Sequence, residues 1–250
     1  MIVGLFHPGE MGSAVGAALR SNGHEVLWAS TGRSEETARR ARDAGLRDAG
    51  SAEAVLAEAE LVFSIVPPHA ASAVAATAAG FGGLFVDANA ISPATARALA
   101  PARLVDGSIV GPPPLEHGAT RLYLSGDGAD ETAGLFAGST LDARVVSGGI
   151  GAASALKMTY AAWSKGTAAL LLAIRSVARA DNVEEALLSE WRESAPELFE
   201  RLDRAERSAD EKGWRWIGEM EEIAETFAAA GQPDGFHRAA AQVYREWAAR

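Results

Sequence analysis

The sequence predicts an α/β fold in which a doubly wound, mostly parallel sheet is followed by a smaller all-helical domain. The first observation is that short apolar runs alternate with small-residue helical segments from residue 2 to residue 146. Such alternation is typical of a parallel sheet that helices cover on both faces. The second is that no convincing strand follows Ser147-Gly148-Gly149. We therefore expect an α/β domain over residues 1–149 and a helical domain over residues 150–250.

The expected elements follow from the hydrophobic pattern and from helix-stop signals such as Asn22-Gly23. Strands are expected over residues 2–6, 25–29, 61–66, 84–86, 104–106, 121–125 and 144–146. Helices of the first domain are expected over residues 11–21, 34–44, 51–59, 70–79 and 93–99. The second domain is expected to contain helices over residues 152–180, 183–202 (with a break considered at Pro196), 208–230 and 235–249.

The composition narrows the classes of partner. The net charge is −10, whereas nucleic acids and anionic membranes favour basic surfaces. Without cysteine the chain has no disulfide, thiol nucleophile or cysteine-bound metal, and the histidine spacing gives no metal site. The first strand starts at residue 2, which leaves no room for a signal peptide, and the apolar stretch 161–173 is too short to cross a bilayer. A cytoplasmic protein with a small-molecule substrate is the default expectation.

The first expected strand runs directly into "HPGEMG", His7 to Gly12. A strand, a glycine turn and a helix N-terminus together form the pyrophosphate site of Rossmann-type dinucleotide-binding domains. Gly9 and Gly12 occupy the second and third glycine positions, but His7 replaces the first. Histidine is among the residues that tolerate a positive φ. We expect a cofactor loop formed by His7, Pro8, Gly9, Glu10 and Met11; the alternative is an ordinary turn without a ligand.

The end of the second expected strand indicates which cofactor fits. NAD-specific sites usually place an acidic residue there to bind the ribose hydroxyls. This chain instead has Ser30, Thr31 and Arg33, and an arginine beside hydroxyl groups suits a 2′-phosphate. The pattern favours NADP(H) over NAD(H), and the alternative is a solvated loop arginine.

Six motifs occur in a fixed order along the chain. They are "HPGEMG" (7–12), "GH" (23–24), "FSIVPP" (63–68), "DANAISP" (87–93), "DGSIVGP" (106–112) and "GGIGAASALK" (148–157). Together they resemble the β-hydroxyacid dehydrogenase family, which includes 3-hydroxyisobutyrate and 6-phosphogluconate dehydrogenases. Residues 215–227 and 235–244 resemble a less-characterised phosphogluconate-dehydrogenase-like branch with its own short C-terminal domain.

The resemblance implies roles for individual residues. It makes Lys157 the catalytic lysine, places Val66 and Pro67 under the nicotinamide, and places Asn89 beside cofactor and substrate. It also implies that the helical domain forms a homodimer and helps to close the active-site cleft. Three further residues are hypothesised to face that cleft, with core packing or solvent exposure as the alternatives: His117, Trp216 and Glu219.

Several positions depart from the family pattern. Asn89-Ala90 replaces a Ser-Thr pair, Val110-Gly111-Pro112 replaces Ser-Gly-Gly, and Ala161 replaces an asparagine. Val110 has no hydroxyl and Pro112 has no N–H donor. Many polar contacts for a small hydroxycarboxylate are therefore missing. We expect a different substrate, contacted by Asn89, Val110, Gly111, Pro112 and Ser164.

The helix over residues 152–180 carries the candidate proton-transfer groups. Interconversion of an alcohol and a carbonyl needs a group that accepts or donates the hydroxyl proton. Lys157 is the candidate, and Tyr160 and Ser164 share its helical face at spacings of three and seven. Tyr160 would orient the lysine or act as a second donor. The alternatives are a lysine that snorkels to solvent and a packing tyrosine.

These features lead to three functional hypotheses. The first is an NADP(H)-dependent oxidoreductase that acts on an alcohol/carbonyl pair. The second is an imine reductase-like activity on the same scaffold, although Lys157 argues against it because related imine reductases usually replace this lysine. The third is a cofactor-binding sensor or assembly protein without catalysis, which the altered motifs motivate.

Overall fold

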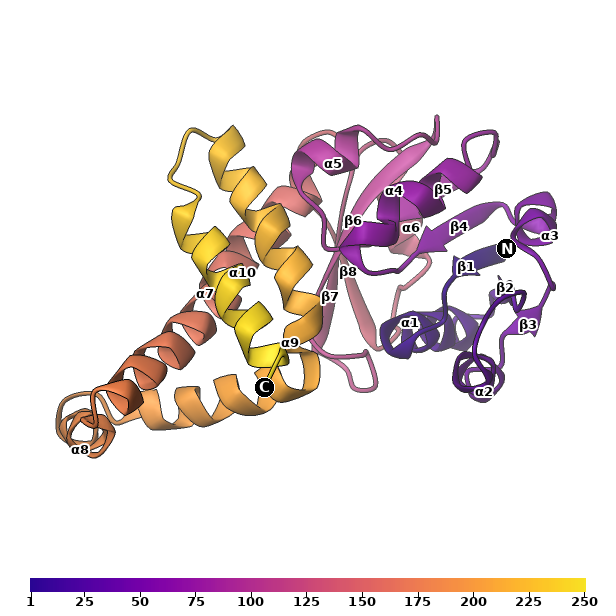
Figure 1. Cartoon of the computed structure of the whole chain (residues 1–250). Helices are drawn as coiled ribbons and strands as arrows, with labels where there is room; N and C mark the ends of the chain where they lie inside the picture. Colours follow the sequence, from indigo (N-terminus) through magenta and orange to yellow (C-terminus); the bar gives the residue numbers. More distant parts are fainter. The chain divides into compact units, whose positions relative to one another are not determined.

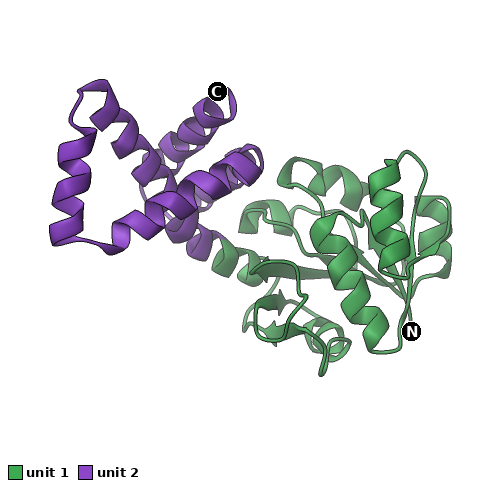
Figure 2. Cartoon of the chain, turned by 90° about the horizontal axis from the view of Figure 1, so that it is seen from below, with its two compact units in different colours: residues 1–157 green, residues 158–250 purple.

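The computed structural model describes residues 1–250 and divides them into two compact units, residues 1–157 and residues 158–250 (Figures 1 and 2). All strands lie in the first unit, and the second is entirely helical. The expected order of an α/β region and then a helical region is therefore confirmed. The domain boundary expected after residue 149 stays a prediction, since the compact units meet within a continuous helix, α7 (Ala152–Ala180).

One eight-stranded sheet forms the centre of unit 1. Its strands in spatial order are β3 (Arg47–Asp48), β2 (Glu25–Trp28), β1 (Ile2–Phe6), β4 (Leu61–Ser64), β5 (Leu84–Asp87), β6 (Leu104–Val110), β7 (Thr120–Ser125) and β8 (Leu141–Val145). The first six strands are parallel, β7 is antiparallel to β6, and β8 is parallel to β7. The order 3-2-1-4-5-6 is that of a Rossmann-type sheet, with its topological switch point between β1 and β4.

Helices cover both faces of this sheet (Figure 1). Alternate residues of β1 face opposite ways, because successive side chains of a strand point to opposite sides. Val3 and Leu5 pack with α1 (Glu10–Ser21), α2 (Glu35–Asp43) and α6 (Ala129–Gly134). Phe6 packs on the other face with α3 (Ala52–Glu58) and α4 (Pro68–Thr77), and the short α5 (Pro93–Arg97) packs beside α4.

Unit 2 consists of most of α7 together with α8 (Glu184–Ser194), α9 (Glu197–Ala229) and α10 (Gly235–Ala248). Helices α9 and α10 pack along one another, with Met220, Ile223 and Tyr244 buried. Arg175 of α7 forms ion pairs with Glu184 and Glu206, which connect it to α8 and α9. No helix of the structure has the length and hydropathy that a membrane span requires.

Most expected elements are present, but three expectations need correction. A helix ending near residue 202 and another starting near residue 208 are wrong, because α9 runs unbroken from residue 197 to residue 229. Leu202, Ala205 and Ala209 keep one buried face continuous through this polar region. The break at Pro196 is present. Strand β6 extends to Val110 instead of ending at residue 106, and both α6 and β3 were not expected.

Candidate active site

The turn after β1 has the conformation that its histidine was expected to tolerate. His7 has φ = 68°, a left-handed conformation that favours glycine, and the turn is closed by a hydrogen bond of 2.7 Å from the Gly9 N–H to the His7 carbonyl oxygen. A Cβ at Gly12 would lie 2.6 Å from that same oxygen. Glycine is therefore required at position 12 for α1 to approach the turn.

The same turn leaves room for an anion. Gly9 is the N-cap of α1 and provides no side-chain cap, and a Cβ placed on it would meet no atom within 4 Å. The first-turn N–H groups of this twelve-residue helix are thus neither capped nor covered by a side chain at Gly9. Such an N-terminus suits a phosphate. The residues present therefore fit a dinucleotide pyrophosphate, with the backbone of Gly9, Glu10 and Met11 as the nearest groups.

Arg33 lies beside this turn. Its Nη2 donates a hydrogen bond to Nε2 of His7 over 3.2 Å. The arginine is placed by a tight turn in which the Arg33 N–H donates to the Ser30 carbonyl and Gly32 has φ = 73°. Thr31 fastens this turn through its N–H and hydroxyl, which both donate to the carbonyl of Gly50. Burial of the imidazole lowers the pKa of His7 to about 4, and the positive charge of Arg33 contributes to this shift to a smaller extent.

Asn89 connects the ends of β4 and β5. Its Oδ1 accepts a hydrogen bond of 2.5 Å from the Val66 N–H, and its Nδ2 donates to Ser64 Oγ and to Asp87 Oδ1. The side chain is buried. The amide thus holds the Val66–Pro67 loop against the sheet. Its expected contact with cofactor or substrate stays a prediction.

Lys157 lies at the carboxyl end of β6, where its Nζ donates a hydrogen bond of 2.7 Å to the Ile109 carbonyl. Because β1, β4, β5 and β6 are parallel, this is the same edge of the sheet at which the His7 turn follows β1. Unit 1 therefore brings the His7 turn, Arg33, the Asn89 loop and Lys157 to one edge. Open α/β sheets bind their ligands at this edge.

A buried carboxylate places the helix that carries Lys157. Asp106, in the middle of β6, accepts hydrogen bonds from the N–H groups of Gly151 and Ser154 and from the hydroxyls of Ser125 and Ser154. The "DGSIVGP" motif contains Asp106 without indicating its role, and no sequence pattern predicts Ser125 or Ser154 at the site. The signal that could have found the cluster is an acid inside an apolar strand, since a buried charge needs several donors.

The remaining expected residues are less closely placed. Val110 is buried, and Gly111 (φ = 125°) and Pro112 are exposed in the loop that also holds the exposed His117. Tyr160 and Ser164 are exposed and belong to unit 2, on the continuation of α7. Their expected roles in catalysis and substrate binding stay predictions.

Two protein families match segments of the chain. Residues 2–91 match the family described as NADP oxidoreductase, coenzyme F420-dependent, and residues 178–247 match a domain of unknown function, DUF1932. The two matches cover separate segments, one in each compact unit of the chain. No curated protein matches the sequence.

Solved structures cover nearly the whole chain. A conserved protein of unknown function, described as structurally similar to 3-hydroxyacid dehydrogenases, is 28% identical with a TM-score of 0.72, covering 99% of this chain and 96% of that one. The 3-hydroxyisobutyrate dehydrogenase of Mycobacterium tuberculosis is 17% identical, with a TM-score of 0.70 and coverages of 99% and 94%. A reductive aminase from Aspergillus terreus, in complex with NADPH and ethyl levulinate, is 19% identical, with a TM-score of 0.59 and coverages of 98% and 92%. The chain thus has the fold that these 3-hydroxyacid dehydrogenase-like proteins and the reductive aminase share.

Within the helical unit that contains the DUF1932 match, Trp216 and Glu219 take part in internal packing. Glu219 is buried and forms an ion pair with Lys165 of α7. Trp216 packs edge-on against Tyr244, whose hydroxyl donates to the Lys165 carbonyl. Both residues therefore have a packing role in unit 2, and the hypothesis that they line a cleft stays untested.

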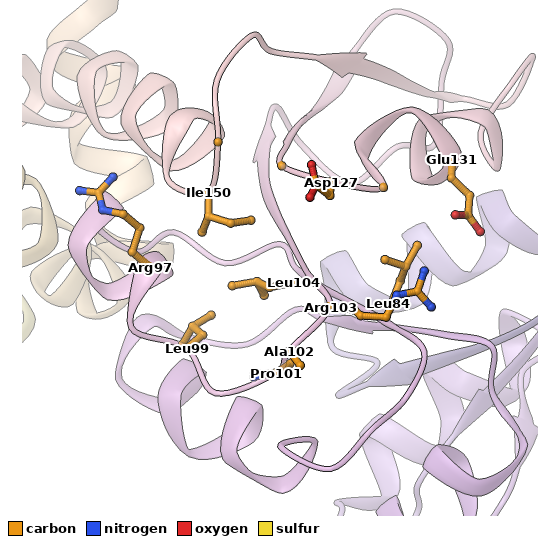
Figure 3. A pocket seen from close by; sticks show the side chains of 13 residues that line it. Leu84, Arg97, Leu99, Pro101, Ala102, Arg103, Leu104, Asp127, Glu131 and Ile150 are labelled. Atoms are coloured by element: carbon orange, nitrogen blue, oxygen red, sulfur yellow. The ribbon is translucent and has the colours of Figure 1, made fainter.

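A pocket of about 610 Å³ lies elsewhere in unit 1 (Figure 3). Leu84 and Leu104, the first residues of β5 and β6, line it, so it opens at the amino edge of the parallel strands. Arg97 and Glu131 lie on opposite sides of it (Figure 3). The pocket is therefore separate from the candidate active site at the carboxyl edge.

Proposed function

We propose that the protein is an NADP(H)-dependent oxidoreductase that transfers a hydride between the nicotinamide and an alcohol/carbonyl substrate. The observation that carries the proposal is the position of Lys157 Nζ, held by the Ile109 carbonyl at the carboxyl edge of the sheet. The open helix N-terminus at Gly9 lies on the same edge. A proton-transfer group and an anion site at that edge are what a dehydrogenase of this fold needs.

The chemistry divides between cofactor and protein. When bound, NADP(H) supplies or accepts the hydride. Lys157 moves the proton: its ammonium donates to the substrate oxygen during carbonyl reduction, and its neutral amine accepts the hydroxyl proton during oxidation. The bond to Ile109 O fixes the position of Nζ. Tyr160, one helical turn further on, is proposed as a second donor.

The preference for NADP(H) over NAD(H) is also a proposal. Its support is Arg33 at the end of β2, where no acidic residue stands. The description of the matching N-terminal family names NADP as well. An arginine there would bind a 2′-phosphate through charge-assisted hydrogen bonds.

We propose a substrate that is less anionic than a simple 3-hydroxy acid. The Val110 side chain is buried, and Pro112 has no N–H to offer a carboxylate. An imine substrate is the second candidate, because solved structures of this fold include imine reductases from Streptomyces aurantiacus and Bacillus cereus. The retained Lys157 favours the carbonyl.

We further propose that the chain forms a homodimer through unit 2. Tyr160, Trp163, Leu170 and Val177 form one stripe along α7 and are between 51% and 64% exposed. Such an apolar stripe on a helix is typical of an interface. The molar mass measured by light scattering in solution should be that of a dimer for the natural protein and that of a monomer for Leu170→Glu. A monomeric natural protein would reject the proposal.

One screen tests the function directly. Calorimetric titration with NADPH and NADH comes first, followed by NADPH oxidation against panels of aldehydes, ketones and imines. We expect NADPH binding and turnover with at least one carbonyl compound. Turnover with imines alone would favour the second candidate. NADPH binding without turnover in any panel would favour a non-catalytic cofactor-binding protein, and no nicotinamide binding would reject all three.

A further inference from the structure

The residue that replaces the first glycine of the turn has a side chain with a specific partner. Glycine adopts a positive φ without steric cost, whereas histidine at φ = 68° does not. If position 7 only had to form a tight turn, glycine would be the more favourable residue. The imidazole of His7 is therefore expected to contribute something that the backbone alone does not.

That contribution is contact with Arg33. The two residues are 26 positions apart, and Nη2 of Arg33 lies 3.2 Å from Nε2 of His7. The hydrogen bond directs the guanidinium toward the cofactor turn from the loop after β2. A glycine at position 7 could not make it.

The chemistry of the acceptor also matters. A carboxylate would hold Arg33 but would neutralise it and repel a phosphate. A neutral imidazole accepts one hydrogen bond through its unprotonated nitrogen and leaves the positive charge intact. Burial and the Arg33 charge lower the pKa of His7 to about 4, which keeps the ring neutral near pH 7. Arg33 is itself exposed, so its charge stays accessible to a ligand.

We infer that His7 is a positioning residue that holds Arg33 in place to bind the 2′-phosphate, and that it thereby sets the preference for NADP(H) over NAD(H). The inference rests on the proposed function. His7 acts through Arg33 and not on the reacting atoms. The ligand group it selects is the 2′-phosphate monoester of an adenine dinucleotide.

The His7→Gly substitution isolates this role, because glycine preserves the backbone conformation and removes only the acceptor. In the full-length protein, calorimetry with NADPH and with NADH gives the ratio of the two affinities. We expect His7→Gly to weaken NADPH binding about tenfold, the lower end of what a hydrogen bond to a charged group contributes. NADH binding should change less than about twofold, which is well under the tenfold step.

Two further variants complete the test. His7→Asn retains an acceptor and tolerates a positive φ, so it should recover part of the NADPH affinity. In an Arg33→Ala background, His7→Gly should have no further effect on NADPH binding. Equal weakening of NADPH and NADH by His7→Gly, or the same loss with and without Arg33, would overturn the inference. If the natural protein does not prefer NADPH, the proposed cofactor choice fails as well; if it does and His7→Gly keeps the ratio, only the inference fails.

Discussion

Asp106 and Ser154 are joined by two hydrogen bonds, from the serine Oγ at 2.6 Å and from its backbone N–H at 3.0 Å. The carboxylate also accepts from the Gly151 N–H, so it caps the first turn of α7 from the middle of β6. A negative charge at a helix N-terminus is favourable. Lys157 lies three residues beyond Ser154, and its placement therefore depends on this buried contact.

Asp106→Asn should destabilise the protein. The substituted amide would present an NH₂ group to donors that need an acceptor, leaving buried polar groups unsatisfied. We expect a loss of about 2–4 kcal/mol in the free energy of unfolding, since such groups cost about 1–3 kcal/mol each. Chemical denaturation measures it. Asp127→Asn, at an exposed position, is the matched control, and equal stability of the two variants would contradict the capping role.

Asn89→Ala should loosen the loop that follows β4. The variant removes the acceptor of the Val66 N–H and the donor to Ser64 and Asp87. The Val66 N–H and the Asp87 carboxylate then lose a buried partner, for an expected cost of about 1–3 kcal/mol. The midpoint temperature of thermal unfolding and the affinity for the nicotinamide cofactor should both decrease. If the variant is as stable as the natural protein but binds the cofactor more weakly, this would instead indicate direct contact between Asn89 and the cofactor.

Lowering the pH should decrease the free energy of unfolding, because His7 gains a proton on unfolding. Its pKa is 6.5 when unfolded and about 4 when folded, so the unfolded chain binds more protons between these values. Stability therefore falls as the pH drops from about 6.5 to about 4. Comparing unfolding free energies of the natural protein and His7→Gly across this window tests it. Parallel pH profiles would show that His7 does not titrate as described.

The local patterns predicted the fold well, whereas the side-chain contacts of the site depend on tertiary structure. Helix α7 has the bounds expected from its small, apolar residues, Ala152 to Ala180. The expected strand at β6 is too short because Gly107 and Ser108 interrupt its apolar run, although both residues are buried and pair with β7. Turn signals also do not reveal a six-residue helix such as α6.

At the site, the motifs indicated His7, Asn89 and Lys157, and the residues after the second strand indicated Arg33. The structure brings the elements that carry them to one edge of the sheet. Sequence spacing could not show that Asn89 bonds to neighbouring strand ends or that Asp106 reaches residues more than 40 positions away. The Asn89 contacts depend on the register of β4 and β5, and the Asp106 contacts depend on how the start of α7 packs against β6. The bond between Arg33 and His7 likewise joins two loops that only the sheet order brings together.

The central claim is that Lys157 transfers the proton that accompanies hydride transfer. The most direct measurement is the single-turnover rate of NADPH oxidation, with a carbonyl substrate from the screen, for the natural protein and for Lys157→Met. Lys212→Met, an exposed lysine of unit 2, is the control. The account predicts that the single-turnover rate falls by about 10²–10⁴-fold in Lys157→Met while its NADPH affinity is unchanged. The Lys212→Met control should have the same rate as the natural protein. A rate for Lys157→Met equal to that of the natural protein would contradict it.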